Sequence, residues 1–566
     1  MTSALLLENF EKLAEAPTGI PTLREMILQL AIRGQLVPQR EAEHPVTDEL
    51  REIRTRKGEY VKARIRGGVK VPRCVPSEDE WFALPDGWEW ARVDDSGDYF
   101  NGLAFKASDW SDEGTRIVRI QNLSDPSAEF NRAKGPFPAD RKASDGDILV
   151  SWSATLDAFL WDRGDVVVNQ HIFKVIPEET VLDRVFLYHL LRVVIRRMAE
   201  SEHAHGLAMK HINRGPFLSH PVGLPPLAEQ KRIVAKVDEL MALCDDLEAK
   251  QQAKRTKQAA LNRASLQALT EPNGASLTAA WHRVRDHFDA LYTVPETVAE
   301  LRQTILQLAV MGRLVPQDPN DEPASELLKK IQAERQRLIT EGAIRRPKPL
   351  PPIDLEEVPF KLPSGWVWAR FPELGEFGRG KSKHRPRNDP TLYREGTHPL
   401  VQTGDVARAN GLIATYTGLY NDEGLAQSRL WPKGTMCITI AANIADSAIL
   451  GFDACFPDSV VGFIPARCLG NTRYFDYFMR TAKGSLLEFA PSTAQKNINL
   501  AILNSVLIPI PPRAELERIA AKVDQLMTLC DNLESKLQRA QTDADNLLAA
   551  VVHELVGSES SEGGSS

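Results

Sequence analysis

The most constraining feature of this chain is an internal repeat. Residues 23–39 read LREMILQLAIRGQLVPQ and residues 301–317 read LRQTILQLAVMGRLVPQ, an offset of 301 − 23 = 278. LPDGWEWAR at 84–92 and LPSGWVWAR at 362–370 are related by the same offset. Further on, LPPLAEQKRIVAKVDELMALCDDLE at 224–248 matches IPPRAELERIAAKVDQLMTLCDNLE at 510–534, an offset of 510 − 224 = 286. The chain is therefore expected to build one structural unit twice.

Similarity between the two copies nearly vanishes at residues 104–209 and 382–495. Only fragments align there: GDILVSW at 146–152 with GTMCITI at 434–440, and IVRIQNL at 117–123 with PLVQTGDV at 399–406. Two copies that served only as a scaffold would not be expected to differ in these regions alone. Two domains that recognise different targets would differ in this way.

Composition narrows the class of protein. A chain of 566 residues is too long for one core, and three to five structural units are expected. The net charge of −7 excludes a wholly basic DNA-coating protein, although local basic surfaces remain compatible with DNA binding. Six dispersed cysteines without C-x-x-C spacing support neither a zinc site nor a disulfide framework. With no long apolar run and no secretory pattern, a cytoplasmic location is expected.

The repeated blocks predict long helices. From residue 227 to about 269 there is no Pro or Gly, and apolar residues recur at four- and three-residue spacings. A Pro-Pro pair before each copy suits a helix start. Such a helix cannot bury its apolar stripe alone, so the two copies are expected to pack on each other. The seam residues are Ile233, Val237, Leu240, Cys244 and Leu247 in the first copy, and Ile519, Val523, Leu526, Cys530 and Leu533 in the second.

The divergent regions predict a different architecture. Short β-rich runs such as DILVSWS at 147–153 and MCITIAA at 436–442 are punctuated by Gly, Pro, Asn and Asp. Each region also holds a helical stretch, at 185–200 and at 474–482. Two compact α/β domains of about 140 residues are expected.

The ILQLAxxGxLVPQ block, the LPxGWxWAR block and the Pro-Pro-x-x-Glu helix start, each present twice and in order, resemble the specificity (S) subunit of type I restriction-modification systems. This resemblance covers nearly the whole chain. The linkers before each LPxGW block are long, which leaves details of subunit contacts open.

The expected fold is α+β, with two α/β target recognition domains separated by two long helices that pack as an antiparallel coiled coil with a pseudo-twofold internal repeat. The expected boundaries follow the blocks. They are an N-terminal helical region at 1–83, a first recognition domain at 84–223, a central helical region at 224–361, a second recognition domain at 362–509, a C-terminal helix at 510–556 and a disordered tail at 557–566.

The resemblance implies that each recognition domain reads one half of a bipartite, asymmetric double-stranded DNA site, and that the helices set the spacer and bind two modification subunits. S-adenosylmethionine, ATP and magnesium are then expected on the modification and restriction subunits, and this chain is expected to carry no catalytic, cofactor or metal site. The alternative is a coiled-coil assembly scaffold whose variable domains bind proteins. A fused methyltransferase-nuclease is disfavoured, because no room remains for a cofactor domain.

One motif is misleading. GEFGRGKS at 375–382 satisfies the P-loop string, but that motif needs a helix beginning at Lys381 to direct backbone N–H groups at phosphate. The KHRPRNDP sequence that follows excludes such a helix. The first copy also has Leu103 and Ala104 in place of Lys381 and Ser382. We interpret the glycines as a turn.

Candidate DNA contacts are basic residues near the start of the second domain and amide, hydroxyl or imidazole side chains among the strands. The alternative for each is a solvated loop or a strand-end residue. The basic loop contains Arg379, Lys381, Lys383, His384, Arg385 and Arg387. The candidates among the strands are Arg119, Gln121, Asn122, Ser151, Ser153, Asn169, Gln170 and His171 in the first domain, and Gln402, Thr403, Asn443 and Ser459 in the second.

Two further sets complete the candidates. The matched tracts Lys210-His211-Ile212-Asn213 and Lys496-Asn497-Ile498-Asn499 recur ahead of each Pro-Pro helix and predict a shared phosphate clamp or a structural turn. A basic tract from Arg51 to Arg73, with a counterpart from Arg335 to Lys348, more often indicates a solvated or partner-facing helix than DNA contact. The repeated tryptophans, Trp88, Trp90, Trp366 and Trp368, and the seam cysteines are expected to be core residues.

Overall fold

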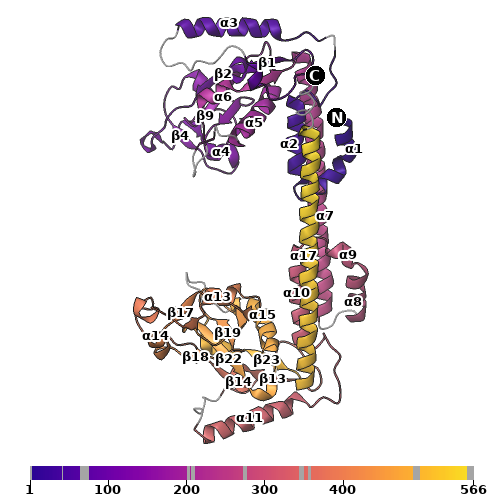
Figure 1. Cartoon of the computed structure of the whole chain (residues 1–566), viewed down its shortest axis with the longest axis vertical. Coiled ribbons are helices and arrows are strands. Elements are labelled where there is room, and N and C mark those ends of the chain that lie inside the picture. The colour runs from indigo at the N-terminus through magenta and orange to yellow at the C-terminus, as the bar shows by residue number, and fades with distance from the viewer. Residues whose placement is uncertain are drawn as a thin grey trace. The chain divides into compact units, whose positions relative to one another are not determined.

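The computed structural model describes residues 3–40, 43–63, 75–200, 204–205, 211–271, 277–342, 350–354, 358–488 and 498–557. It divides into two compact units (Figure 1). Unit 1 comprises residues 1–253 and 541–566, and unit 2 comprises residues 254–540.

Unit 1 contains two four-stranded sheets. The first has the order β2-β9-β6-β7 and is antiparallel throughout. The second has the order β4-β3-β8-β5, with β3 and β8 parallel. The strands are β2 (Gly97–Asn101), β3 (Thr115–Val118), β4 (Asn131–Ala133), β5 (Lys142–Ala143), β6 (Ile148–Ser151), β7 (Asp157–Leu160), β8 (Val166–Val168) and β9 (Ile172–Pro177).

Unit 2 repeats this topology in a sequence that barely aligns. Its first sheet has the order β14-β22-β19-β20, extended by β16, and its second has the order β17-β15-β21-β18, with β15 and β21 parallel. The strands are β14 (Gly375–Arg379), β15 (His398–Leu400), β16 (Leu412–Ile413), β17 (Gly418–Tyr420), β18 (Leu430–Trp431), β19 (Met436–Thr439), β20 (Ser447–Leu450), β21 (Ala454–Cys455) and β22 (Val460–Pro465).

The central strand of each unit shows why these sequences fold alike. Ile148 and Val150 of β6 belong to the main core of unit 1, whereas Leu149 between them packs with residues of the second sheet. In unit 2 the same alternation places Met436 and Ile438 in the main core and Cys437 in the smaller one. Alternate side chains of a strand point to opposite faces, so a strand covered on both faces needs a continuous apolar run.

Helices cover these cores. In unit 1, α5 (Arg184–Glu200) contributes its apolar face to the main core, as α15 (Arg473–Glu488) does in unit 2. Short helices follow the strands, and helical pairs precede each domain. These are α1 (Ser3–Ala14), α2 (Gly19–Ile32), α3 (Thr47–Ala63), α4 (Ile120–Ser124) and α6 (Arg214–Ser219) in unit 1, and α8 (Leu277–Asp286), α9 (Phe288–Leu291), α10 (Glu296–Val310), α11 (Ala324–Thr340), α12 (Phe371–Leu374), α13 (Thr403–Arg408), α14 (Asp422–Ala426) and α16 (Leu500–Ser505) in unit 2.

The two long helices pack together, as predicted. They are α7 (Leu227–Thr270) and α17 (Arg513–Gly557). The core of unit 1 contains the first turns of α7, through Ile233 and Cys244, with Val552 of α17 packed against it. The core of unit 2 contains the last turns of α7, through Leu266, together with the first turns of α17, through Ile519. Each unit thus joins the beginning of one long helix to the end of the other, which is the arrangement of an antiparallel pair.

The LPxGWxWAR block ties each domain to its long helix. Its strand β1 (Glu89–Arg92) pairs with β12 (Pro221–Leu224) in unit 1, and β13 (Val367–Arg370) pairs with β23 (Leu507–Ile510) in unit 2. Trp366 is buried and donates from Nε1 to Glu515, the glutamate of Pro-Pro-x-x-Glu, over 3.0 Å. The core role predicted for Trp88 and Trp366 is confirmed, since both are at least nine-tenths buried. The same prediction is wrong for Trp90 and Trp368, which are only partly buried and contact Phe82 and Phe360.

The P-loop string is confirmed as misleading. The residues that directly follow Gly380 form no helix. The interpretation of the glycines as a turn is wrong, however, because Gly375 and Gly378 belong to strand β14 and pair with β22. A Cβ on Gly380 would lie 2.3 Å from the Phe456 carbonyl oxygen, and one on Gly102 would lie 2.2 Å from the Asn169 carbonyl oxygen. These glycines are needed because two backbone segments pass in contact at the same place in both domains. No helix within the described ranges is long and apolar enough to cross a membrane.

Candidate nucleic-acid interface

The ends of the parallel strands gather candidate residues of unit 1 at one edge. β3 and β8 run side by side with Val118 opposite Val168, so Arg119 and Asn169 leave the sheet together. The backbone N–H of Asn169 donates to the Val118 carbonyl over 3.1 Å. Because the carboxyl ends of parallel strands share an edge, residues fifty positions apart in the chain become neighbours.

The end of β6 brings further candidates to this edge. The Trp152 N–H donates to the His171 carbonyl, and the Ile212 N–H donates to the Trp152 carbonyl over 3.0 Å. Ser153 and His211 form a β-bridge. We call this set edge 1; it consists of Arg119, Ser153, Asn169, Gln170, His171 and His211.

Unit 2 forms an equivalent edge from different side chains. The Ile440 N–H donates to the Ser459 carbonyl and the Ile498 N–H donates to the Ile440 carbonyl, both over 3.0 Å. The parallel pairing of Leu400 with Cys455 brings Gln402 to the same side. We call this set edge 2; it consists of Gln402, Asn443, Asp458, Ser459 and Asn499.

Several candidates are occupied by structural hydrogen bonds. Asn122 is fully buried: its Oδ1 accepts from the Arg119 N–H, and its Nδ2 donates to the Ala128 and Glu129 carbonyls. Ser151 is also fully buried and donates to the Ser153 carbonyl. Asn499 is exposed, but its Oδ1 accepts from the Ile502 N–H and caps α16. Burial assigns Asn122 and Ser151 to the scaffold of the edge.

The remaining candidates are accessible to different degrees. The Arg119 guanidinium donates to Asn131 over 3.0 Å and lies 5.6 Å from the ring centre of Trp110. Gln170 is exposed and its Nε2 lies 3.2 Å from His171 Nε2. Exposed side chains outside these contacts are Gln121, Asn213, Gln402 and Asn443, and Thr403 is half-buried in the first turn of α13.

The basic loop of unit 2, residues 379–387, is anchored at its backbone. Gln427 Oε1 accepts from the N–H groups of Lys383, over 2.6 Å, and His384. Ser428 donates to the Lys381 carbonyl over 2.9 Å, and Ser382 is buried. The loop is therefore a fixed part of the surface, although its charged side chains are exposed.

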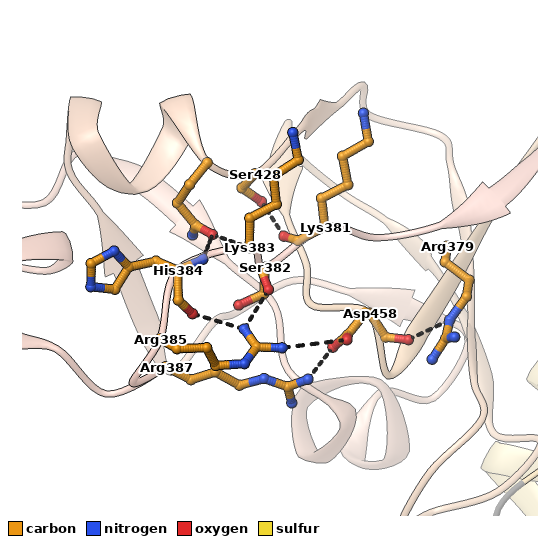
Figure 2. Close-up of polar contacts among 10 residues, drawn as sticks. Arg379, Lys381, Ser382, Lys383, His384, Arg385, Arg387, Ser428 and Asp458 are labelled. Carbon is orange, nitrogen blue, oxygen red and sulfur yellow. Dashed lines mark hydrogen bonds and ion pairs between the residues drawn. The ribbon is translucent and has the colours of Figure 1, made fainter.

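The charged side chains of the basic loop divide into two groups (Figure 2). Arg379, Arg385 and Arg387 gather at Asp458 of edge 2. The lysines Lys381 and Lys383 extend away from Asp458, and no ion pair joins either of them to the described part of the chain. Beside them, His384 contacts Asp389 over 2.8 Å, and hydrogen bonds from Thr391 and His384 lower the pKa of Asp389 to about 2.

The basic tract of α3 is largely engaged within the protein. Arg54 donates to the Trp90 carbonyl over 2.8 Å, Lys57 donates to the Gly97 carbonyl over 2.8 Å, and Arg56 pairs with Glu178. In α11, Arg337 pairs with Glu334 and Glu341. These intramolecular contacts disfavour a direct DNA role for these side chains, and those of Arg54, Arg56 and Lys57 join α3 to the first domain. The later basic residues of both tracts, Arg64, Arg66, Lys70, Arg73, Arg345, Arg346 and Lys348, lie outside the described residues, as do Lys210, Lys496 and Asn497 of the repeated tracts.

Sequence reasoning missed three residues at these edges. Ala154 and Ala442 follow β6 and β19 at equivalent positions, and both have left-handed backbones, with φ of 58° and 63°. Non-glycine residues are uncommon there, and the shared strain marks the turn beside each edge. Asp458 was missed because one acidic residue in a turn has no sequence pattern. Within the described residues, no cluster of three or more His, Cys, Asp or Glu could hold a metal ion.

Two edges of one topology, lined by unlike polar side chains on a duplicated scaffold, define a class of paired binding modules. Residues 85–255 and 363–540 both match the type I restriction modification DNA specificity domain. These two matches cover more than half of the chain, which therefore belongs to the family of type I restriction-modification specificity subunits.

Curated relatives agree with this assignment. The chain is 30% identical over 558 residues to the EcoAI specificity subunit of Escherichia coli, covering 92% of this chain and 91% of the relative. It is 31% identical over 561 residues to the EcoEI specificity subunit of the same organism, with the same coverage. Among solved structures, it resembles the HsdS subunit from Thermoanaerobacter tengcongensis with a TM-score of 0.41 and 17% identity, over 84% of this chain and 98% of that one.

Proposed function

We propose that each unit reads one half of a bipartite, asymmetric DNA site, through edge 1 in the first recognition domain, residues 84–223, and edge 2 in the second, residues 362–509. The observation that carries this proposal is that both domains share their sheet order, apart from the added strand β16, and the parallel pair of the second sheet, while the side chains at the shared edge differ. A single framework with two sets of polar side chains suits recognition of two different base sequences.

We infer the rest of the complex from the family to which the chain belongs. The long helices set the spacing between half-sites, and the repeated helical surfaces bind two modification subunits. Those subunits hold S-adenosylmethionine, and restriction subunits supply ATP- and magnesium-dependent cleavage. A complex that acts on the chromosome would work in the cytoplasm.

A domain exchange tests the proposal. Residues 104–209 are replaced by the corresponding segment of another family member, and the variant is expressed with the modification subunits while the methylated sites are sequenced. One half of the methylated motif should change while the other half and the spacer stay the same. A motif that changes in both halves, or in neither, would contradict the assignment of one half-site to each domain.

The alternative, an assembly scaffold whose variable domains bind proteins, predicts a different measurement. Its complex with the modification subunits would show no salt-dependent affinity for duplex DNA. A DNA-reading complex loses affinity steeply as salt rises, because each neutralised phosphate releases counterions.

A further inference from the structure

The arginine cluster of unit 2 is organised by one carboxylate. Asp458 lies in the turn between β21 and β22, and its Oδ1 accepts from Arg387 Nη2 over 2.6 Å. Arg385 Nη2 lies 4.0 Å from Asp458 Oδ2, and Arg379 Nε donates to the Asp458 carbonyl over 2.8 Å. Figure 2 shows the three guanidinium groups converging on this residue.

This arrangement leaves part of two guanidinium groups available. Arg379 uses only its Nε among the bonds that the described residues form, so the fork of its two terminal nitrogens is open. Arg387 uses one terminal nitrogen, and its side chain is half exposed. Arg385 is more fully engaged, because its Nη1 also donates to the Ser382 and His384 carbonyls. Arg379 and Arg387 are therefore the residues able to bind a ligand.

A carboxylate beside a basic loop that binds DNA is unexpected. An exposed ion pair adds little to stability, and a negative charge opposes the approach of phosphate. Its benefit is geometric, since it holds a planar fork in one orientation. A guanidinium held in this way suits the bidentate contact with the O6 and N7 atoms of guanine, for which Arg geometry is specific.

The described part of the first domain has no equivalent carboxylate at this turn. The Gly102 N–H donates to the Ile172 carbonyl, and the Gly380 N–H donates to the Val460 carbonyl, so Ile172 and Val460 are at equivalent positions. Two residues before them lie Gln170 and Asp458, which are therefore also equivalent. Gln170 contacts His171 instead of an arginine. The segment that carries the arginines, between the close-contact glycine and the parallel strand, is also longer in the second copy. It spans 400 − 380 = 20 positions from Gly380 to Leu400, against 117 − 102 = 15 from Gly102 to Ile117.

Resting on the proposed function, we propose that Asp458 is a positioning residue that orients Arg387 and Arg379 toward a guanine in the half-site read by the second domain. Edge 2 is thus specific for guanine through these arginines, and edge 1 uses other side chains. Lys381 and Lys383, which extend away from Asp458, contribute affinity without base preference.

The test uses the full chain assembled with its modification subunits. Once the methylated motif is known, binding is measured to the cognate duplex, to duplexes with each guanine of the second half-site replaced by adenine, and to an unrelated duplex. Asp458→Asn should reduce discrimination at one guanine about tenfold, while affinity for the unrelated duplex stays equal or rises. Arg387→Lys, which keeps the charge and loses the fork, should reduce discrimination at the same guanine.

Asp422→Asn is the matched control, because Asp422 is an exposed carboxylate of the same domain whose side chain pairs, among the described residues, only with His398. It should leave discrimination unchanged. The inference is overturned if Asp458→Asn keeps full discrimination, if it weakens cognate and unrelated binding equally, or if the second half-site has no guanine. A wild-type complex without a bipartite motif would instead overturn the proposed function itself.

Discussion

The two recognition domains show how much sequence can change under one topology. Their sheets have the same order and the same parallel pair, yet their interiors use different chemistry at equivalent places. In unit 2, the buried Asp476 of α15 accepts from Ser447 of β20 over 2.7 Å and pairs with Arg480. The equivalent positions of unit 1, judged from strand register and from the RxFxY start of both helices, hold Leu187 and Ala158, which are both buried. The fold needs this face of the helix to be buried against the sheet, and it accepts either a hydrogen-bonded polar pair or an apolar pair at this position.

Substitution of the glycines at the close backbone contacts should have the largest effect on stability, and a similar effect in both domains. Gly380→Ala and Gly102→Ala each place a Cβ less than 2.5 Å from backbone oxygen atoms at the turns before β22 and β9. Two of these oxygens, those of Pro457 and Asn169, accept hydrogen bonds within the turns, so they cannot move without breaking them. Each variant should lose about 3 kcal/mol or more of unfolding free energy, measured by urea denaturation. The control is Gly484→Ala in α15, where a new Cβ meets no atom within 4 Å, and a gain of about 0.5–1 kcal/mol is expected. If either variant kept the unfolding free energy of the wild type, the two close contacts, and so the two edges, would not be equivalent.

The polar pair of unit 2 should respond less strongly, and in a pH-dependent way. Burial raises the pKa of Asp476 to about 6 in the folded protein, above its usual 3.8. The folded state then holds a proton that the unfolded state releases between about pH 4 and 6, so this group's contribution to stability increases as pH falls through 6.

Asp476→Leu with Ser447→Ala and Arg480→Leu, which copies Leu187, Ala158 and Leu191 of unit 1, should stabilise the protein by about 1–2 kcal/mol at pH 7.5, with a smaller gain at pH 5. Urea denaturation at both pH values measures this. Ser447→Ala alone should destabilise, because it removes a hydrogen bond from a buried carboxylate. An equal gain at both pH values would show that the carboxylate charge is not the cause.

The strained turn beside each edge should give the smallest effect. Ala442→Gly and Ala154→Gly release a left-handed alanine and should each stabilise by up to about 1 kcal/mol. Thermal denaturation measures the shift. A loss of stability in one domain alone would show that the two turns, despite their matching φ angles, are held by different contacts.

Much of the architecture could be predicted from the sequence. The repeat offsets, the heptad seam and the double prolines predict the duplicated scaffold and its packed helices, because helix periodicity and core burial follow from local order. The aligned fragments are consistent with the structure: β6 and β19 occupy equivalent positions in their sheets, and Arg119 and Gln402 both begin short helices capped by the residue three positions on.

Which side chains of the candidate sites lie together was decided only by the tertiary structure. Asn122 and Ser151 looked like Gln170 and Asn443 in sequence, but the fold buries the first two in hydrogen bonds and leaves the other two exposed. The role of Asp458 could not be predicted, because the turn between β21 and β22 meets the basic loop only through sheet pairing of segments about 70–80 residues apart. Periodicity reports local structure, whereas a surface assembled from several strand ends depends on long-range pairing that no local pattern encodes.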